Sequence, residues 1–510
     1  MAIINLPVPA NSSTRLWEVN KHNHLRSCLP SGRATFTTLS AAAMRSANMA
    51  AANEAPLWEF DYIQSLKNEY AGDIYVSRAN ELKEQVKMML DEGDMKLLDC
   101  MELVDGLERL GLAYHFEGRI NRLLISAYKA IHEGNHKRNK EDLYAAALEF
   151  RIFRQNGFNV PQDTFNDFIT EDGEFDESLS EDIMGMLSLY EASFLSLEGE
   201  GTLDLAREFT TKHLNNYLGK ENTDQNLRIL VYHALELPLR WRVPRIEARW
   251  YIDAYERSPN MNPTLLELAK IDFNIVQAIH QQDLKHVSWW WNNIRIAEKL
   301  TFIRDRIAEN FFWTIGVVFE PQYGSCRRML TKALVLITMI DDIYDVYGTL
   351  DELELFTDAV DRWDVKAIDQ LPDYMRWADV CKAYLREAKW YYAGYTPTVE
   401  EYLENAWVSI SVPVMLMHVY AVITNPMNKE AMDVLDTHDI VRWSSYILRF
   451  ADDLGTSPGE MKRGDVPKLV QCYMKEAGCS EEESREHVWF LLRETWKKMN
   501  KDSVAESCVI

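Results

Sequence analysis

An apolar helix that runs into a group of carboxylates constrains this chain more than any other feature. Residues 333–340 read Ala-Leu-Val-Leu-Ile-Thr-Met-Ile and lead directly into Asp341, Asp342 and Asp345. A helix that is apolar almost all round belongs in a protein interior, whereas the C-terminal end of a helix favours cations over acids. Helical spacing places Asp341 and Asp345 on one face. The pattern predicts a bound divalent cation such as Mg²⁺, with a solvated acidic helix end as the alternative.

A second acidic cluster follows further along the chain. Asp452, Thr456 and Glu460 recur at four-residue spacing, so their oxygens share one helical face and could chelate one ion. The two stretches, DDIYD and DDLGTSPGE, resemble the paired metal motifs of class I terpene synthases, DDxxD and (N/D)Dxx(S/T)xxxE. Either motif alone is a weak signal, but the pair is highly specific.

Composition limits the partners. The 510 residues carry a net charge of −24, which argues against nucleic acid or an anionic membrane as a partner. An anionic substrate stays compatible if metals and local arginines supply the positive field. The seven cysteines are scattered and lack CxxC spacing, which indicates a reducing compartment without disulfides or a zinc site.

Residues 1–44 have the composition of a transit peptide. They hold one acid, Glu18, against Arg15, Lys21, Arg26 and Arg33, with many serines and threonines. No continuous apolar core is present, so the segment is more typical of plastid import than of secretion. We therefore expect a plastid (chloroplast) protein. The alternative is a disordered N-terminal segment without a targeting signal.

The periodicity beyond Trp58 predicts an all-α protein. Apolar residues at Met101, Val104, Leu107 and Leu110 follow one face of a helix, and no alternating strand pattern stands out. The resemblance covers most of residues 58–507. It implies two helical domains: an N-terminal α-barrel-like domain over residues 45–250, and a C-terminal class I terpenoid synthase bundle over residues 251–510, which holds both motifs. No DxDD acid motif is present, so metal-assisted ionisation is the expected way to start the reaction.

Two features suggest other functions. His132 and His136 match the HExxH pattern of zinc proteases, but glycine and asparagine lie between them, and a polar loop is the favoured interpretation. Residues 406–426 carry no charge, which suggests a membrane-spanning helix as one interpretation. Ser409, Ser411 and a proline favour a kinked buried helix instead, and in the resembled family the matching helix is broken near these serines. We expect no membrane span.

The resemblance also implies the site residues. Three Mg²⁺ ions, which Mn²⁺ could replace, would hold a prenyl diphosphate and stabilise charge on its leaving oxygens. Asp342 is expected to orient ligands and nearby cations more than to bind an ion itself. Trp313 would stabilise a carbocation, with Leu334 and Thr338 also lining the cavity. The metal group is Asp341, Asp342, Asp345, Asp452, Thr456 and Glu460; the diphosphate group is Arg304, Arg306, Arg449 and Lys468; the catalytic group is Asp341, Asp345, Arg304 and Trp313.

The expected substrate is geranyl diphosphate, used by a monomer or weak homodimer to make a monoterpene with release of diphosphate. The segment that begins at Arg45 resembles the start of mature monoterpene synthases. Those proteins usually have two adjacent arginines there, which are linked to the isomerisation that precedes ring closure. Here Met44 replaces the first arginine, which favours an acyclic product. A sesquiterpene synthase that uses farnesyl diphosphate is one alternative. A chain-elongating prenyltransferase would show two DDxxD motifs instead. A truncated, inactive homologue is the other alternative.

Three departures from the family pattern support that last alternative. Pro458 and Gly459 disfavour helix inside the second motif. Between Met375 and Trp377 the chain lacks roughly thirty residues that the family has, which is one to two helices' worth. The expected last helices and the lid of the active site are also missing before Ile510, so the C-terminal domain is expected to be incomplete.

Overall fold

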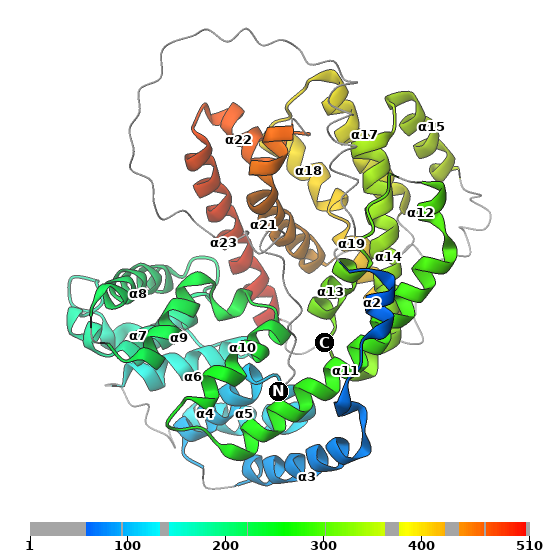
Figure 1. Ribbon diagram of the computed structural model, residues 1–510. Helices are drawn as coiled ribbons and strands as arrows, with labels where there is room; N and C mark the ends of the chain where they lie inside the picture. Colours follow the sequence, from blue (N-terminus) through cyan, green and yellow to red (C-terminus); the bar gives the residue numbers. More distant parts are fainter. Residues whose placement is uncertain are drawn as a thin grey trace. The chain divides into compact units, whose positions relative to one another are not determined.

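Helices form the regular structure of this computed structural model (Figure 1). The structure describes residues 58–92, 95–132, 142–221, 223–300, 302–362, 377–423, 438–463 and 466–505. Within these ranges the β-type pairing consists of one isolated bridge, between Ile169 and Phe175. The predicted all-α fold is confirmed.

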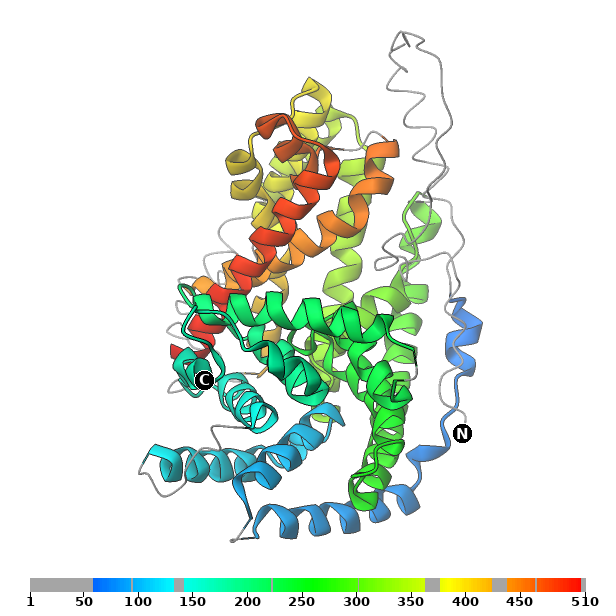
Figure 2. The same ribbon diagram turned by 90° about the vertical axis from the view of Figure 1, so that its left-hand side faces the viewer.

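The helices can be followed along the chain in Figures 1 and 2. The first half contains α2 (Phe60–Ser65), η2 (Glu69–Ala71), α3 (Asp73–Leu90), α4 (Leu97–Arg109), η3 (Ala113–His115), α5 (Glu117–His132), α6 (Leu143–Gln155), η4 (Gln162–Phe168), η5 (Glu177–Glu181), α7 (Ile183–Ser193), α8 (Gly201–Gly219), α9 (Gln225–Glu236), η6 (Leu239–Trp241) and α10 (Pro244–Glu256). The second half contains α11 (Pro263–Ile294), α12 (Ile296–Lys299), α13 (Ile307–Val317), η7 (Pro321–Tyr323), α14 (Gly324–Asp342), η8 (Ile343–Tyr347), α15 (Leu350–Asp361), α17 (Trp377–Ala393), α18 (Val399–Ser409), α19 (Val412–Ile423), α21 (Asp439–Arg463), α22 (Leu469–Ala477) and α23 (Glu481–Ala505).

The chain divides into two compact units. Among the described residues, the N-terminal unit comprises Phe60–Trp289, Ala308–Thr331 and residues 493–505. The described part of the C-terminal unit comprises residues 58–59, Trp290–Ile307 and Lys332–Leu492. The predicted limits at residues 44 and 250 stay predictions, and the expected transit peptide lies outside the described residues.

The core of the N-terminal unit follows from helical periodicity. Met101, Val104, Leu107 and Leu110 in and directly after α4 are at most 1% exposed, as their spacing predicted. Helix α4 packs against α6, α6 against α7, and α7 against α8. Burial of apolar side chains at each of these contacts is the main stabilising contribution to such a bundle.

The core of the C-terminal unit surrounds the end of α14. Helix α15 packs against α17 beside it, and α15 begins at a capping box in which Thr349 and Glu352 satisfy each other's backbone N–H groups. These helices bury one apolar cluster: Ile337, Ile340, Tyr344, Leu353, Val380, Cys381, Tyr384, Ala388 and Val414. The acidic end of α14 is therefore fixed on a packed base.

The two ambiguous stretches have different outcomes. His132 is the last residue of α5, and His136 lies outside the described residues, so the HExxH pattern is not tested. The uncharged stretch 406–426 is broken as expected, because α18 ends at Ser409 and Ser411 adopts a left-handed backbone with φ of 64°. In the described parts of the chain, no helix combines the length and hydrophobicity that a membrane crossing requires.

Candidate active site

The first acidic motif lies where α14 passes into the π-helical turn η8. The side chain of Asp341 is 34% exposed and that of Asp342 is fully buried. Asp345, on η8, is exposed. The apolar face of α14 that precedes them packs into the core, so the helix carries its carboxylates to the edge of a packed region.

Arg304 joins the two aspartates of this motif. Its backbone N–H donates to Asp342 over 2.9 Å and its Nε donates to the same carboxylate, while Nη2 donates to Asp341 over 2.9 Å. One guanidinium group is therefore shared between two carboxylates. Arg306, which was also predicted to bind the diphosphate, is half-buried two residues further on.

The second motif lies on α21 and repeats the pattern. The side chain of Asp452 is 39% exposed and that of Asp453 is fully buried. Arg449, one turn earlier, donates from Nη1 to Asp452 over 3.4 Å and to Asp453 over 3.3 Å. Thr456 is exposed and donates its hydroxyl to the Asp452 carbonyl over 2.9 Å. An arginine is again shared by one accessible and one buried aspartate.

Glu460 lies within the helical range of α21, but its side chain is outside the described residues. The helix continues through Pro458 and Gly459 to Arg463, although both residues disfavour helix. The backbone spacing on which the second motif depends is therefore kept from Asp452 to Glu460.

Asp453 is a central residue that the sequence analysis missed. It accepts hydrogen bonds from the hydroxyl of Tyr402 over 2.8 Å and from the backbone N–H of Leu469 over 3.0 Å, besides its contact with Arg449. It thereby ties α21 to α18 and to the start of α22. The doubled aspartate in each motif was a usable signal, because the second member is the buried one in both.

Glu387, on α17, connects Lys468 to the break between α18 and α19. The carboxylate accepts hydrogen bonds from Ser409 over 2.6 Å and from Asn405 over 3.1 Å, and Lys468 Nζ lies 3.7 Å away. Glu387 is 3% exposed, and the sequence analysis did not single it out. The strained backbone at Ser411 adjoins this group, and strain of that kind concentrates at functional sites.

Burial disfavours the ionised form of three aspartates in the two motifs. Desolvation raises the pKa of Asp341, Asp342 and Asp453 above the usual aspartate range, although Arg304 and Arg449 oppose the shift. A raised pKa means that the ionised form is incompletely compensated. Added positive charge would therefore be stabilised beside these carboxylates.

The remaining predicted residues are only partly placed. Among the described side chains, no three acidic, histidine or cysteine groups already converge closely enough to hold a metal ion. Trp313 lies on α13 in the N-terminal unit and is 56% exposed, so its place in a shared cavity stays a prediction. Leu334 packs at the edge of the C-terminal core, and Thr338 donates its hydroxyl to the Leu334 carbonyl over 3.0 Å.

Comparison with known proteins identifies the family. The model of the terpene synthase N-terminal domain matches residues 57–235. The model of the terpene synthase metal-binding domain matches residues 292–378 and 376–498. The chain belongs to the terpene synthase family. It is thus an enzyme of the lyase class that acts on prenyl diphosphates, as the motifs predicted.

Individual relatives agree with this assignment. A chloroplastic limonene synthase of Coffea arabica is 85% identical to this terpene synthase over 554 aligned positions, which cover 99% of this chain and 91% of the relative. A crystal structure of limonene synthase with 2-fluorolinalyl diphosphate has a TM-score of 0.83 at 45% identity, and covers 89% of this chain and 91% of that one. Isoprene synthase of grey poplar, in complex with three Mg²⁺ ions and dimethylallyl-S-thiolodiphosphate, has a TM-score of 0.79 at 42% identity, with 89% and 91% covered.

Proposed function

We propose that this terpene synthase ionises geranyl diphosphate with Mg²⁺ and releases a monoterpene and diphosphate. One observation carries the proposal: each acidic motif pairs an accessible aspartate, Asp341 or Asp452, with a buried aspartate that holds an arginine. Carboxylate oxygens suit Mg²⁺, and guanidinium groups suit diphosphate. The names of the limonene synthase relative and of the ligand-bound neighbours support the same substrate class.

The residues would act in two groups. Asp341, Asp345, Asp452, Thr456 and Glu460 would hold the Mg²⁺ ions, three in number as in the isoprene synthase complex, with Mn²⁺ as a substitute. Bound Mg²⁺ supplies positive charge to the leaving oxygens of the diphosphate. Asp342 and Asp453 would keep Arg304 and Arg449 directed towards the diphosphate.

Lys468 and Arg306 would complete the binding of the diphosphate. Glu387 holds Lys468 beside the helix break, where the peptide carbonyls near Ser411 would face the substrate chain. Trp313 would stabilise the carbocation through its aromatic face. These contacts would orient the prenyl chain and keep it away from water until the cation has reacted.

The product and the location are further parts of the proposal. The relative is named for limonene, a cyclic monoterpene, which favours a cyclic product over the acyclic one expected from Met44. Position 44 lies outside the described residues. The relative is also named chloroplastic, which together with the composition of residues 1–44 supports plastid import. A monomer or weak homodimer stays a prediction.

A truncated, inactive homologue is the second candidate function. The alignment with the limonene synthase relative has 554 positions, more than the 510 residues of this chain, so the relative has residues that this chain lacks. The metal-binding match is split in two pieces that meet at residues 376–378, where the sequence suggested a missing segment. Leu355 on nearby α15 is 68% exposed, which is consistent with lost apolar cover.

Product analysis tests both candidates. Purified protein should be incubated with geranyl or farnesyl diphosphate and Mg²⁺, and the products separated by gas chromatography. Conversion of geranyl diphosphate to a monoterpene supports the proposal, and the cyclic or acyclic nature of the product decides the question raised by Met44. Faster use of farnesyl diphosphate would indicate a sesquiterpene synthase. Absence of turnover with both substrates would favour the inactive homologue.

A further inference from the structure

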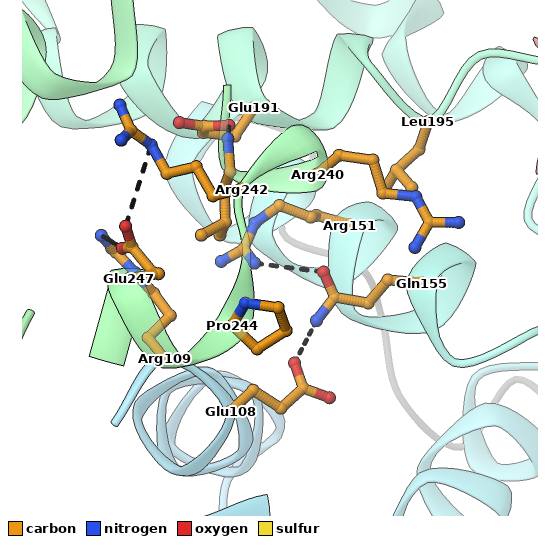
Figure 3. Close-up of a pocket in the computed structure, with 11 residues that line it drawn as sticks. Glu108, Arg109, Arg151, Gln155, Glu191, Leu195, Arg240, Arg242, Pro244 and Glu247 are labelled. Carbon is orange, nitrogen blue, oxygen red and sulfur yellow. Dashed lines mark hydrogen bonds and ion pairs between the residues drawn. The ribbon is translucent and has the colours of Figure 1, made fainter. Parts of the chain in front are cut away.

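A charged cavity lies inside the N-terminal unit, apart from the residues assigned to catalysis. It has a volume of about 260 Å³ and lies between α4, α6, α7 and the segment from η6 to α10 (Figure 3). Its lining is mostly ionic, with four arginines, three glutamates and few apolar side chains: Glu108, Arg109, Arg151, Gln155, Glu191, Leu195, Leu239, Arg240, Arg242, Pro244 and Glu247. Such a wall does not suit a prenyl chain.

The arginines of the cavity differ in how well they are paired. Arg151 donates to Asp105 over 2.6 Å, and Arg109 donates to Glu247 over 3.0 Å. Arg240 is different. Among the described residues no carboxylate lies within ion-pair distance of it, and its one polar contact is from Nε to the side-chain oxygen of Asn500 over 3.3 Å.

Arg240 is half-buried, and its guanidinium group also lies over the ring of Trp496, 5.6 Å from the ring centroid. Desolvation lowers the pKa of Arg240, which shows that its charge is poorly compensated. The Nε of Arg109 is buried and has no hydrogen-bond acceptor in the structure. Buried donors and cations are normally paired, because an unpaired one loses its hydration without compensation. An anion in the cavity would supply the missing acceptors.

Two of the three glutamates of the cavity provide little of this compensation. The third, Glu247, has a pKa lowered to about 2 and is already paired with Arg109 and Arg242. Glu108 accepts hydrogen bonds from the side-chain amides of Gln155 and Asn156, and Glu191 accepts from the backbone N–H of Leu239 over 2.8 Å. Desolvation raises the pKa of Glu108 and of Glu191 to about 7 each. Their negative charge is therefore incomplete near neutral pH, and the four arginines outnumber the three glutamates of the lining.

We propose that this cavity is a binding site for a small phosphate-type oxyanion, with Arg240 and Arg109 as its charged donors. Planar guanidinium groups match the oxygens of phosphate and diphosphate. The cavity is smaller than the roughly 300 Å³ at which pockets for drug-sized ligands begin, which fits a free anion rather than a nucleotide or a prenyl diphosphate. The site goes beyond the proposed function and does not depend on it.

Binding can be measured without turnover. The full chain should be titrated calorimetrically with inorganic phosphate and, separately, with inorganic diphosphate, in the presence of a chelator to exclude Mg²⁺. Saturable binding of at least one anion is expected, with no equivalent heat from sodium chloride at the same ionic strength. Absence of saturable binding of both anions in the millimolar range would overturn the proposal.

Variants then locate the site. Arg240→Gln should weaken binding at least tenfold, whereas Arg257→Gln, at an exposed arginine of the same unit outside the cavity, should leave it unchanged. Arg449→Gln separates the cavity from the proposed diphosphate residues of the C-terminal unit. If binding falls in Arg449→Gln and survives in Arg240→Gln, the anion belongs to the other site and the proposal is wrong.

Two further measurements guard against misfolding. Arg240→Lys keeps the positive charge but loses the planar fork, so it should weaken binding less than Arg240→Gln while preserving the circular dichroism spectrum. Crystals soaked in tungstate, a heavy phosphate analogue, should show an anomalous peak beside Arg240. A tungstate-soaked crystal whose cavity is empty would contradict the proposal whatever the variants do.

Discussion

Two buried carboxylates, Glu247 in the N-terminal unit and Asp453 in the C-terminal unit, have opposite pKa shifts. Desolvation favours the neutral form of both. For Glu247, hydrogen bonds from His233 over 2.7 Å and Arg109 over 3.0 Å outweigh that effect and lower its pKa to about 2. For Asp453, desolvation prevails and its pKa is raised.

The difference lies in how the cationic partners are distributed. Glu247 is one acid with three basic partners, Arg109, His233 and Arg242. The closest donors to Asp453 are a hydroxyl and a backbone N–H, and its arginine is shared with Asp452. Arg304 is likewise shared between Asp341 and Asp342. A closed ionic cluster is suited to holding a fold together, whereas an acidic excess is suited to receiving cations.

The largest effect is expected from adding the segment that the sequence analysis expects this chain to lack. Inserting a segment of roughly thirty residues, one to two helices, from a related monoterpene synthase between Met375 and Trp377 should raise the turnover of geranyl diphosphate. It should also raise the melting temperature, because it covers apolar surface beside α15 and α17. A Gly/Ser insert of equal length is the control. Equal rates and melting temperatures with and without the segment would show that it is dispensable.

Asp341→Asn should abolish or nearly abolish turnover. The substitution removes the negative charge that is proposed to bind Mg²⁺. The loss of such electrostatic stabilisation costs on the order of 3 kcal/mol or more, which is a hundredfold or more in rate. The fold should survive, because the change also removes repulsion at the end of α14. Asp172→Asn, at an exposed acid of the N-terminal unit, is the matched control. The rates are compared in the chain as it stands or, if that chain is inactive, in the chain with the inserted segment. An unchanged rate at saturating Mg²⁺ would rule out Asp341 as a ligand.

Replacing the carboxylates of Glu247 and Asp453 by amides, one at a time, should affect the stability of the fold in the first variant and turnover in the second. Glu247→Gln leaves Arg109 and His233 without a buried counter-charge, so it should lower the free energy of unfolding by about 3 kcal/mol. Asp453→Asn keeps an acceptor for Leu469 but loosens Arg449, so it should lower turnover more than stability. Chemical denaturation and steady-state rates distinguish the two. Equal losses of stability in both variants would remove the proposed contrast.

Acid should destabilise the N-terminal unit through His280. Burial, with a further contribution from Arg327, lowers the pKa of His280 to about 3, and its Nε2 is bonded to the Phe319 carbonyl over 2.8 Å. The unfolded chain takes up the proton near pH 6.5 and the folded chain does not, so stability is full above that pH and falls as the pH drops towards 3. The expected loss from this group between pH 7 and pH 5 is about 2 kcal/mol. Thermal unfolding at the two pH values should show a smaller difference in His280→Gln; an identical difference would exclude this cause.

The sequence predicted the features that depend on local spacing. Periodicity and residue type predicted the buried positions of α4 and the break between α18 and α19. They also predicted that both acidic motifs lie on helices. Helical geometry fixes which side chains share a face, so such features need no knowledge of the remaining chain.

The partners of the buried charges could not be predicted in the same way. Asp453 bonds to Tyr402 on α18, and Glu387 bonds to Ser409 and lies near Lys468, all across long stretches of sequence. Only packing brings those segments together. Which member of a doublet is buried, and which arginine it holds, therefore became visible only in the folded chain.

The central claim is that the acidic excess of the C-terminal unit receives Mg²⁺ together with a prenyl diphosphate. The most direct test is a calorimetric titration of the intact chain with geranyl S-thiolodiphosphate, an analogue that resists ionisation, with and without Mg²⁺. This measurement does not require the chain to be active. We predict binding that needs Mg²⁺ and is lost in Asp341→Asn but kept in Glu247→Gln. Binding of equal strength without Mg²⁺, or undiminished binding in Asp341→Asn, would contradict the claim.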